Sequence, residues 1–297
     1  MRPILLLVPA LVLTACTAPA ERDPGLKVGG AFGAEPSVAF PSGRPPDGLR
    51  IDQLSAGKGA KLGVGDVAIV HYTAHVWDGA ENRRVDSSFA RGAPAAFPVG
   101  RLVPGLDKAL AGRAVGSRVI AAIPPAEGFG ANPPQGVGPA DRLLYVMDVL
   151  GAHAEGESVK GRAGAYAGVR VGGGRRPELS LPAAPPPARY SAKVLVRGDG
   201  PRVERGQLVV TQYAGAVWGR RRVFDSTWDS GRPRAFTIGD GGVIQAWERA
   251  LMGVPVGSRV LVLAPPHSAY GRAGLPALGI RPSDTLVFVV DVLAAYR

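Results

Sequence analysis

The chain has 297 residues, 46% hydrophobic and 20% charged, with a formal net charge of +11. This is enough for two domains of about 100 residues each, plus connecting segments. The positive charge would suit nucleic-acid binding, but the arginines are scattered apart from 220–222, so we expect no nucleic-acid partner. A basic surface near an anionic membrane or cell wall, with long-range attraction to acidic partners, fits the sequence better.

The N-terminus reads MRPILLLVPALVLTAC, with one arginine and an apolar run too short to span a bilayer comfortably. These sixteen residues are typical of a signal peptide. Small residues followed directly by Cys16 resemble a bacterial lipobox, in which the thiol is diacylated. We therefore expect an exported, lipid-anchored protein at the cell membrane, facing outside the cytoplasm. The alternative is a plain secreted protein in which Cys16 is incidental. It is the only cysteine, so no disulfide framework is possible.

Two segments have the composition of connectors. Residues 17–47 begin rich in Ala, Gly and Pro and end in a proline-rich arm, Glu35–Pro46, which predicts a flexible tether followed by a stiff spacer. Residues 152–188 begin rich in glycine and contain a second arm, Arg176–Pro187, which predicts a linker between domains.

An internal repeat organises the rest of the chain. Tyr72 and Trp77 in VHYTAHVW match Tyr213 and Trp218 in TQYAGAVW at a spacing of 141 residues, and the proline arms and later glycines follow the same spacing. Two copies indicate a tandem duplication, not a solenoid. The predicted domains are residues 48–151 and 189–297.

Each copy has the pattern of an α+β domain. In the second copy, residues 208–218 are rich in β-formers, short strands surround Phe224 and Phe236, and residues 259–264 and 286–293 predict two late strands. Good helix formers over 245–252, followed by Gly253, predict one short helix. The pattern favours an antiparallel sheet wrapped around that helix.

Several kinds of chemistry find no support in the sequence. It has no phosphate-binding glycine loop with lysine and no Gly-x-Ser-x-Gly elbow. The four histidines lack zinc-type spacing, and Asp86 and Asp225 have no partner carboxylate at a fixed spacing. We expect no metal and no cofactor. What remains is a set of aromatic residues around one acid.

The order of these aromatic residues resembles the FKBP-type peptidyl-prolyl cis/trans isomerases. Tyr213, Phe224-Asp225-Ser226, Phe236, Val243-Ile244 and Trp247 carry the resemblance, and Tyr270, Ile280 and Phe288 extend it, so that it covers residues 189–297. The resemblance implies two tandem FKBP-like domains. It also implies isomerisation of X-Pro bonds in exported proteins, with proline-containing peptides and unfolded exported proteins as partners.

The resemblance assigns roles by position. Trp247 would form the floor under the proline ring, and Tyr213, Phe224, Phe236 and Phe288 the walls. The main-chain N–H of Ile244 and the hydroxyl of Tyr270 would hydrogen-bond the peptide. The residues implied in catalysis are Tyr213, Phe224, Asp225, Trp247 and Tyr270. Those implied in substrate binding are Phe236, Val243, Ile244, Ile280 and Phe288. The copy departs from the family pattern at Leu275, where the family has histidine, and in its arginine-rich turn before Phe224.

The first copy has a thinner aromatic lining, in which Leu106 replaces the floor tryptophan and Phe129 replaces Tyr270. We therefore expect weaker catalysis there and a client-binding role. Its equivalent positions are Tyr72, Val85, Asp86, Phe97, Leu102, Val103, Leu106, Phe129, Val137 and Tyr145. Two alternatives to an enzyme stay open: a non-catalytic proline-peptide-binding or chaperone module at the cell surface, and a purely structural envelope protein without a ligand.

Overall fold

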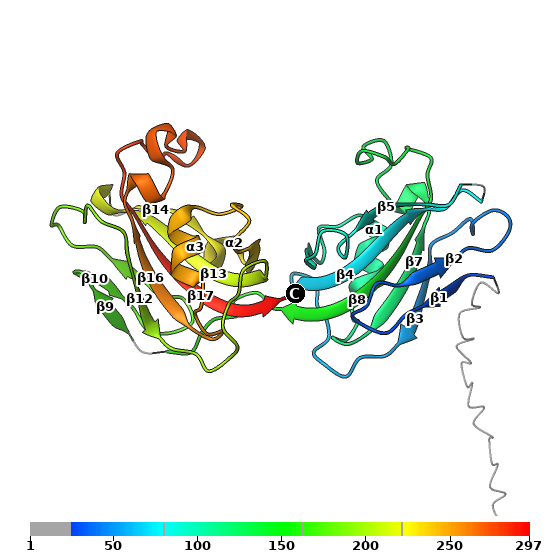
Figure 1. Cartoon of the computed structure of the whole chain (residues 1–297), viewed down its shortest axis with the longest axis horizontal. Helices are drawn as coiled ribbons and strands as arrows, with labels where there is room; N and C mark the ends of the chain where they lie inside the picture. The colour runs from blue at the N-terminus through cyan, green and yellow to red at the C-terminus, as the bar shows by residue number, and fades with distance from the viewer. Residues whose placement is uncertain (1–24, 80, 162, 221) are drawn as a thin grey trace, which may run out of the picture.

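The computed structural model describes residues 25–297 except 80, 162 and 221, so the predicted leader and Cys16 lie outside the described residues. Two similar α+β domains follow one another along the chain (Figure 1). Within the described residues, no helix has the length and apolarity needed to cross a membrane.

Each domain is an antiparallel sheet over one face of a short helix, as the sequence predicts. The first domain contains β3 (Arg50–Ser55), β4 (Val67–Val76), β5 (Arg83–Ser87), β6 (Ala95–Pro98), α1 (Pro104–Leu110), β7 (Arg118–Ile123), η1 (Pro125–Glu127) and β8 (Leu143–His153). The strand order is β3-β7-β8-β4-β5, and β6 pairs with β4.

The second domain repeats this topology as β12-β16-β17-β13-β14, with β15 paired to β13. Its strands are β12 (Ser191–Val196), β13 (Leu208–Val217), β14 (Arg222–Ser226), β15 (Arg234–Thr237), β16 (Arg259–Ala264) and β17 (Leu286–Tyr296). Its helical segments are η2 (Trp218–Arg220), α2 (Thr227–Ser230), α3 (Gln245–Leu251), η3 (Pro266–Ser268), η4 (Gly271–Ala273) and η5 (Pro276–Leu278). The four-residue α2 is absent from the sequence prediction, and it is capped by the Ser226 hydroxyl, which accepts from the Asp229 N–H.

All ten residues of β13 are buried, although a strand in a one-sided sheet alternates between buried and exposed positions. The reason is that both faces of each sheet are covered. One face packs on the helix, and the other packs on segments that the sequence analysis assigns to connectors.

The segment predicted as a tether forms a hairpin on the first sheet, so this prediction is wrong for residues 25–47. Strands β1 (Lys27–Gly29) and β2 (Ser37–Ala39) pair with each other. Apolar side chains in these strands and directly beside them pack on a buried cluster around Trp77: Leu26, Val28, Val38 and Phe40. The buried guanidinium of Arg118 donates to the carbonyls of Gly30 and Ala31 at 2.6 and 2.8 Å while it pairs with Asp148. The arm is part of the domain and not a spacer.

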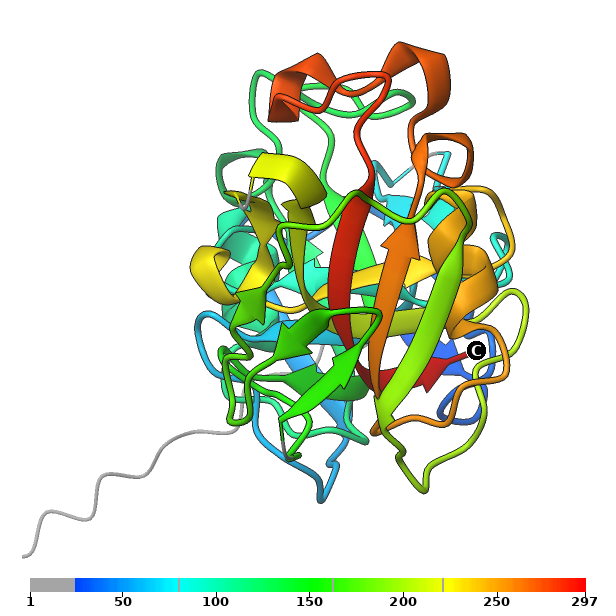
Figure 2. The ribbon, with the colours of Figure 1, turned by 90° about the vertical axis from the view of Figure 1, so that its left-hand side faces the viewer.

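The segment predicted as a linker is likewise ordered on the second sheet. Strands β9 (Gly164–Tyr166), β10 (Val169–Val171) and β11 (Leu179–Ser180) form a small sheet that lies over the outer face of the second domain (Figure 2). The Trp218 indole donates to the carbonyl of Ala184 at 2.8 Å, which holds the proline arm to the domain. These strands could not be recognised in the sequence, because an alternation of apolar and polar residues over only two or three positions, among glycines and prolines, gives no clear pattern.

The two domains contact each other directly, and the proline arms do not set their separation. The C-terminal ends of β8 and β17 meet between them (Figure 1). Val67 and Ile69 of β4 pack with Leu208 and Val210 of β13 in one buried cluster. The Tyr296 hydroxyl lies 2.8 Å from His153 Nε2 and covers a glycine, Gly151, at which any Cβ would lie about 2.1 Å from that hydroxyl oxygen.

Candidate functional site

The second domain contains a cavity of about 430 Å³ between α3, β14, β15 and the loop after β16. The sequence analysis assigns ten residues to this site, and nine of them line it. The lining consists of Tyr213, Phe224, Asp225, Arg234, Phe236, Gly241, Gly242, Val243, Ile244, Trp247, Tyr270, Leu278 and Phe288. The cavity is thus mainly aromatic, with one carboxylate and one guanidinium at its side.

Trp247 forms the floor because α3 begins at Gln245 and its first turn points into the sheet. The indole is 4% exposed, and three rings stand nearly perpendicular to it. The ring centroids lie 5.0 Å from Tyr213, 5.5 Å from Phe236 and 5.6 Å from Phe288, with interplanar angles of 81–90°. Edge-to-face contacts of this kind favour a rigid arrangement. The floor is therefore flat, apolar and fixed.

A polar pair lies at the side of this floor. The Tyr213 hydroxyl donates to Asp225 Oδ2 at 2.5 Å, and Arg234 Nη1 donates to the same hydroxyl oxygen at 2.9 Å and to the carboxylate at 3.2 Å. Burial, and then the hydrogen bond to Asp225 and the Asp225 charge, raise the pKa of Tyr213 far above its usual range. The tyrosine is therefore neutral at physiological pH, and Asp225 is occupied in orienting it.

Two donors at the rim have no partner among the described residues. Ile244 is the N-cap of α3, and its N–H finds no backbone or side-chain acceptor in the described part of the chain. The Tyr270 hydroxyl likewise makes no hydrogen bond to a described residue. Burial, with a further contribution from Asp225, raises the pKa of Tyr270, so that it keeps its proton. Both groups are available to a carbonyl oxygen of a bound peptide.

Ile280 does not line the cavity, contrary to the sequence analysis. Its backbone bridges to Leu275, which turns the side chain into the core, where it is 3% exposed. Leu278 lines the cavity in its place. The sequence analysis also missed Arg234, Gly241 and Gly242, for which no motif gave a signal.

The first domain contains the equivalent cavity, of about 480 Å³, and all ten residues assigned to it lie in the lining. These are Tyr72, Val85, Asp86, Phe97, Leu102, Val103, Leu106, Phe129, Val137 and Tyr145, together with Arg101, Pro134 and Gln135. The floor is Leu106, so no flat ring lies there. Val85 and Leu106 are smaller than Phe224 and Trp247 of the second cavity, so two aromatic rings are missing from this lining.

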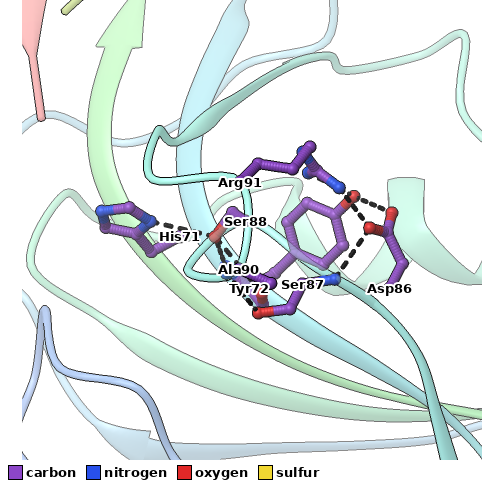
Figure 3. Close-up of polar contacts among 7 residues, drawn as sticks. All are labelled: His71, Tyr72, Asp86, Ser87, Ser88, Ala90 and Arg91. Atoms are coloured by element: carbon purple, nitrogen blue, oxygen red, sulfur yellow. Dashed lines mark hydrogen bonds and ion pairs between the residues drawn. The ribbon is translucent and has the colours of Figure 1, made fainter. Parts of the chain in front are cut away.

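The polar pair recurs in the first cavity with a guanidinium from a different place. Figure 3 shows Arg91 reaching the Tyr72 hydroxyl and the Asp86 carboxylate, with the hydroxyl oxygen accepting from Arg91 Nη2 at 3.0 Å. Burial, and then the hydrogen bond to Asp86, raise the pKa of Tyr72 to about 12. The Tyr145 ring lies 5.8 Å from that of Tyr72, so this cavity has a hydroxyl where the second has Phe288.

The described residues offer no obvious metal site, since no three His, Cys, Asp or Glu side chains among them are grouped closely enough. His71 has structural partners instead: Nδ1 lies 2.9 Å from the Ser88 hydroxyl (Figure 3). Its Nε2 lies 3.1 Å from the Arg297 carbonyl.

Comparison with known proteins agrees with this geometry. The sequence model of the family described as "FKBP-type peptidyl-prolyl cis-trans isomerase" matches residues 58–150 and 200–293. An "FK506-binding protein" of Streptomyces anulatus is 38% identical over 119 residues, which are 40% of this chain and 96% of that protein. "Peptidyl-prolyl cis-trans isomerase FKBP10" of Mus musculus is 26% identical over 260 residues, 84% of this chain and 38% of that protein.

Among solved structures, FkpA from Escherichia coli is 33% identical over 36% of this chain and 48% of its own, with a TM-score of 0.33. The three FKBP domains of wheat FKBP73 align with 84% of this chain and 94% of their own, at 23% identity and a TM-score of 0.34.

Proposed function

Because the chain belongs to the FKBP-type peptidyl-prolyl cis-trans isomerase family, we propose that it catalyses cis/trans isomerisation of X-Pro bonds and that the cavity of the second domain carries most of this activity. The observation that supports the proposal is the Trp247 floor with three rings nearly perpendicular to it, beside two donors that have no partner among the residues that the structure describes. A proline ring fits such a floor, and the donors suit the flanking peptide carbonyls.

The reaction needs no nucleophile. Amide resonance sets a barrier of roughly 18–20 kcal/mol, while the two isomers of an X-Pro bond differ by only about 0.5–1 kcal/mol. In the twisted transition state the nitrogen loses conjugation and the amide becomes less polar. A dry aromatic cavity therefore favours the twisted amide over the planar one. A thousandfold acceleration needs only about 4 kcal/mol of differential binding.

The side chains divide this work. Trp247 and the rings around it hold the proline and exclude water. The Ile244 N–H and the Tyr270 hydroxyl hydrogen-bond the peptide carbonyls and hold the rest of the peptide in place, so that rotation is confined to the X-Pro bond. Burial and Asp225 keep Tyr213 protonated, and Asp225 and Arg234 together orient it in the wall; neither exchanges a proton with the substrate.

The first cavity acts mainly in binding. It keeps the Tyr72–Asp86 pair and the rim, but Leu106 cannot offer a flat surface to the proline ring. We expect isomerisation there to be roughly ten- to a hundredfold slower than in the second cavity, because an aromatic contact and a hydrogen bond each contribute about 0.5–1.5 kcal/mol.

The direct test of the activity is isomerisation of an Ala-Leu-Pro-Phe peptide by the full chain. A rate that rises linearly with protein concentration is expected. A folded sample whose rate equals the uncatalysed rate, yet which binds the peptide, would instead favour the non-catalytic binding module.

Export and lipid anchoring through Cys16 are part of the same proposal, supported by the leader and the lipobox-like sequence. A diacylglyceryl group supplies the two acyl chains that stable anchoring requires. Cys16→Ser should move the protein out of the membrane fraction or block its processing. Wild-type protein found wholly in the soluble fraction with an unmodified Cys16 would contradict anchoring.

A further inference from the structure

A third cavity, of about 310 Å³, lies between the two domains. We call it the inter-domain groove. It shares Arg234 and Phe236 with the cavity of the second domain, and it shares Arg101 with the cavity of the first. The groove therefore adjoins both proline sites, with Arg234 and Phe236 at its border with the second cavity and Arg101 at its border with the first.

The sides of the groove are positive. Arg101 of the first domain and Arg232 and Arg234 of the second line it, and no carboxylate in the described part of the chain does. Arg234 already contacts Asp225, at 3.2 Å. Arg101 and Arg232 make no side-chain hydrogen bond or ion pair with any described residue. The Glu155 carboxylate lies against Gly231, the residue before Arg232, but it forms an ion pair with neither Arg101 nor Arg232. Two guanidinium groups are thus available to an anionic ligand.

The floor of the groove is apolar, and two of its residues are prolines, which restrict the backbone. Val67 and Pro233 are buried, and Pro98, Ala96 and Ala235 are half-buried beside them. A free inorganic anion would gain nothing from such a floor. An extended peptide gains from both parts of the groove, since its small apolar groups lie on the floor while its carboxylates meet the arginines.

We propose that the inter-domain groove binds acidic residues of the client chain whose proline occupies the cavity of the second domain. This specificity rests on the proposed function, because the client is held by its X-Pro bond at one end of the groove. The first domain contributes through Arg101, so recognition of an acidic client needs both domains together. The preferred substrates are thus proline-containing segments flanked by Asp or Glu.

The test uses the full chain and three fluorescein-labelled peptides with one central Leu-Pro bond, flanked on both sides by Glu, Gln or Lys. Each exposed charge pair changes a dissociation constant by roughly 1.4- to 5-fold. The Glu peptide should therefore bind several-fold more tightly than the Gln peptide, and the Lys peptide least tightly. The advantage of the Glu peptide should shrink between low salt and about 0.5 M salt, because salt screens exposed charges.

Substitutions of single arginines distinguish binding in the groove from a general attraction to the positive charge of the protein. Arg232→Gln should weaken binding of the Glu peptide by roughly 1.4- to 5-fold and leave binding of the Gln peptide unchanged. Arg101 also lines the first cavity, so its variants are judged by the ratio of Glu-peptide to Gln-peptide affinity, which should fall by roughly 2- to 25-fold in the double variant Arg101→Gln with Arg232→Gln. The control Arg50→Gln removes an exposed arginine at the start of β3, away from all three cavities, and should leave the preference intact. Arg232→Gln should also leave isomerisation of a neutral tetrapeptide unchanged.

The outcomes distinguish the groove from the activity. Equal affinity for the Glu and Gln peptides, or an equal effect of Arg50→Gln, would overturn the groove proposal even if isomerisation is observed. An acidic preference that depends on Arg101 and Arg232 would support the groove even in a chain that fails to isomerise, and in that case the proposed activity alone would be wrong.

Discussion

The floor of the second cavity provides the sharpest prediction, because the first domain shows that leucine can occupy the same position. Trp247→Leu converts the floor into that of the first cavity. The variant loses three edge-to-face contacts, each worth about 0.5–1.5 kcal/mol, but keeps much of its buried apolar surface. We expect a loss of about 2–3 kcal/mol in the free energy of unfolding, below the 3–5 kcal/mol typical of truncating a buried aromatic residue to alanine.

The effect of Trp247→Leu on catalysis is expected to be separate from its effect on stability, and it is measured on the folded protein. The proline ring loses one aromatic contact, about 0.5–1.5 kcal/mol, and burial of roughly one methylene, about 0.8 kcal/mol. The sum of about 1.3–2.3 kcal/mol corresponds to a fall in kcat/KM of roughly 10- to 50-fold.

The assay is isomerisation of Ala-Leu-Pro-Phe by protein whose folding is checked by urea denaturation. Trp228→Leu is the matched control, since Trp228 packs on the outer-face cluster and lies outside the cavity. Its kcat/KM should stay within about twofold of wild type. A folded Trp247→Leu protein with wild-type kcat/KM would refute the floor's role in binding the transition state.

Three further perturbations test other parts of the structure. Tyr270→Phe should lower kcat/KM by roughly 2- to 12-fold through loss of one hydrogen bond, whereas Tyr190→Phe, outside the cavity, should not change it. Arg259→Met leaves the fully buried Asp291 carboxylate without its guanidinium and should lower the free energy of unfolding, measured by urea denaturation, by about 3–5 kcal/mol. The double variant Arg259→Met with Asp291→Leu should recover most of that loss, and equal losses in the two variants would contradict this reasoning. Burial lowers the pKa of His71 and of His75 below the usual 6.5, so their contribution to stability is present above pH 6.5 and is lost as the pH falls below it. His71→Gln with His75→Ala, the residues that the second domain has at these positions, should reduce the fall in the urea midpoint between pH 7.5 and 5.5, and an unchanged fall would exclude these histidines as its source.

Much of the second domain could be predicted from the sequence. Its sequence patterns identified β13, β16, β17 and α3 to within a few residues. Each strand is long enough to show a clear run of β-forming residues, and the helix is a run of helix formers that ends at a glycine. The aromatic positions then followed from a resemblance, which also placed the first cavity correctly at every position assigned to it.

The hairpins on the outer faces could not be predicted because their strands have two or three residues each, among glycines and prolines. The two arginines that contact the Tyr–Asp pairs could not be predicted for a different reason. Arg91 follows Asp86 by five residues, whereas Arg234 follows Asp225 by nine, so the repeat does not align two side chains that reach the same place. The inter-domain groove depends on how β4 and β13 pack together, which no local pattern encodes.

The most direct test of the second cavity as the centre of isomerisation compares Phe236→Ala with Phe97→Ala. These two residues are identical in the two cavities, and each lines its own, so the same change is made in each proline site. Phe236→Ala is expected to lower the kcat/KM of the full chain for Ala-Leu-Pro-Phe by at least about tenfold, whereas Phe97→Ala should change it by less than about twofold. Equal losses, or a larger loss from Phe97→Ala in folded protein, would contradict the assignment of catalysis to the second domain.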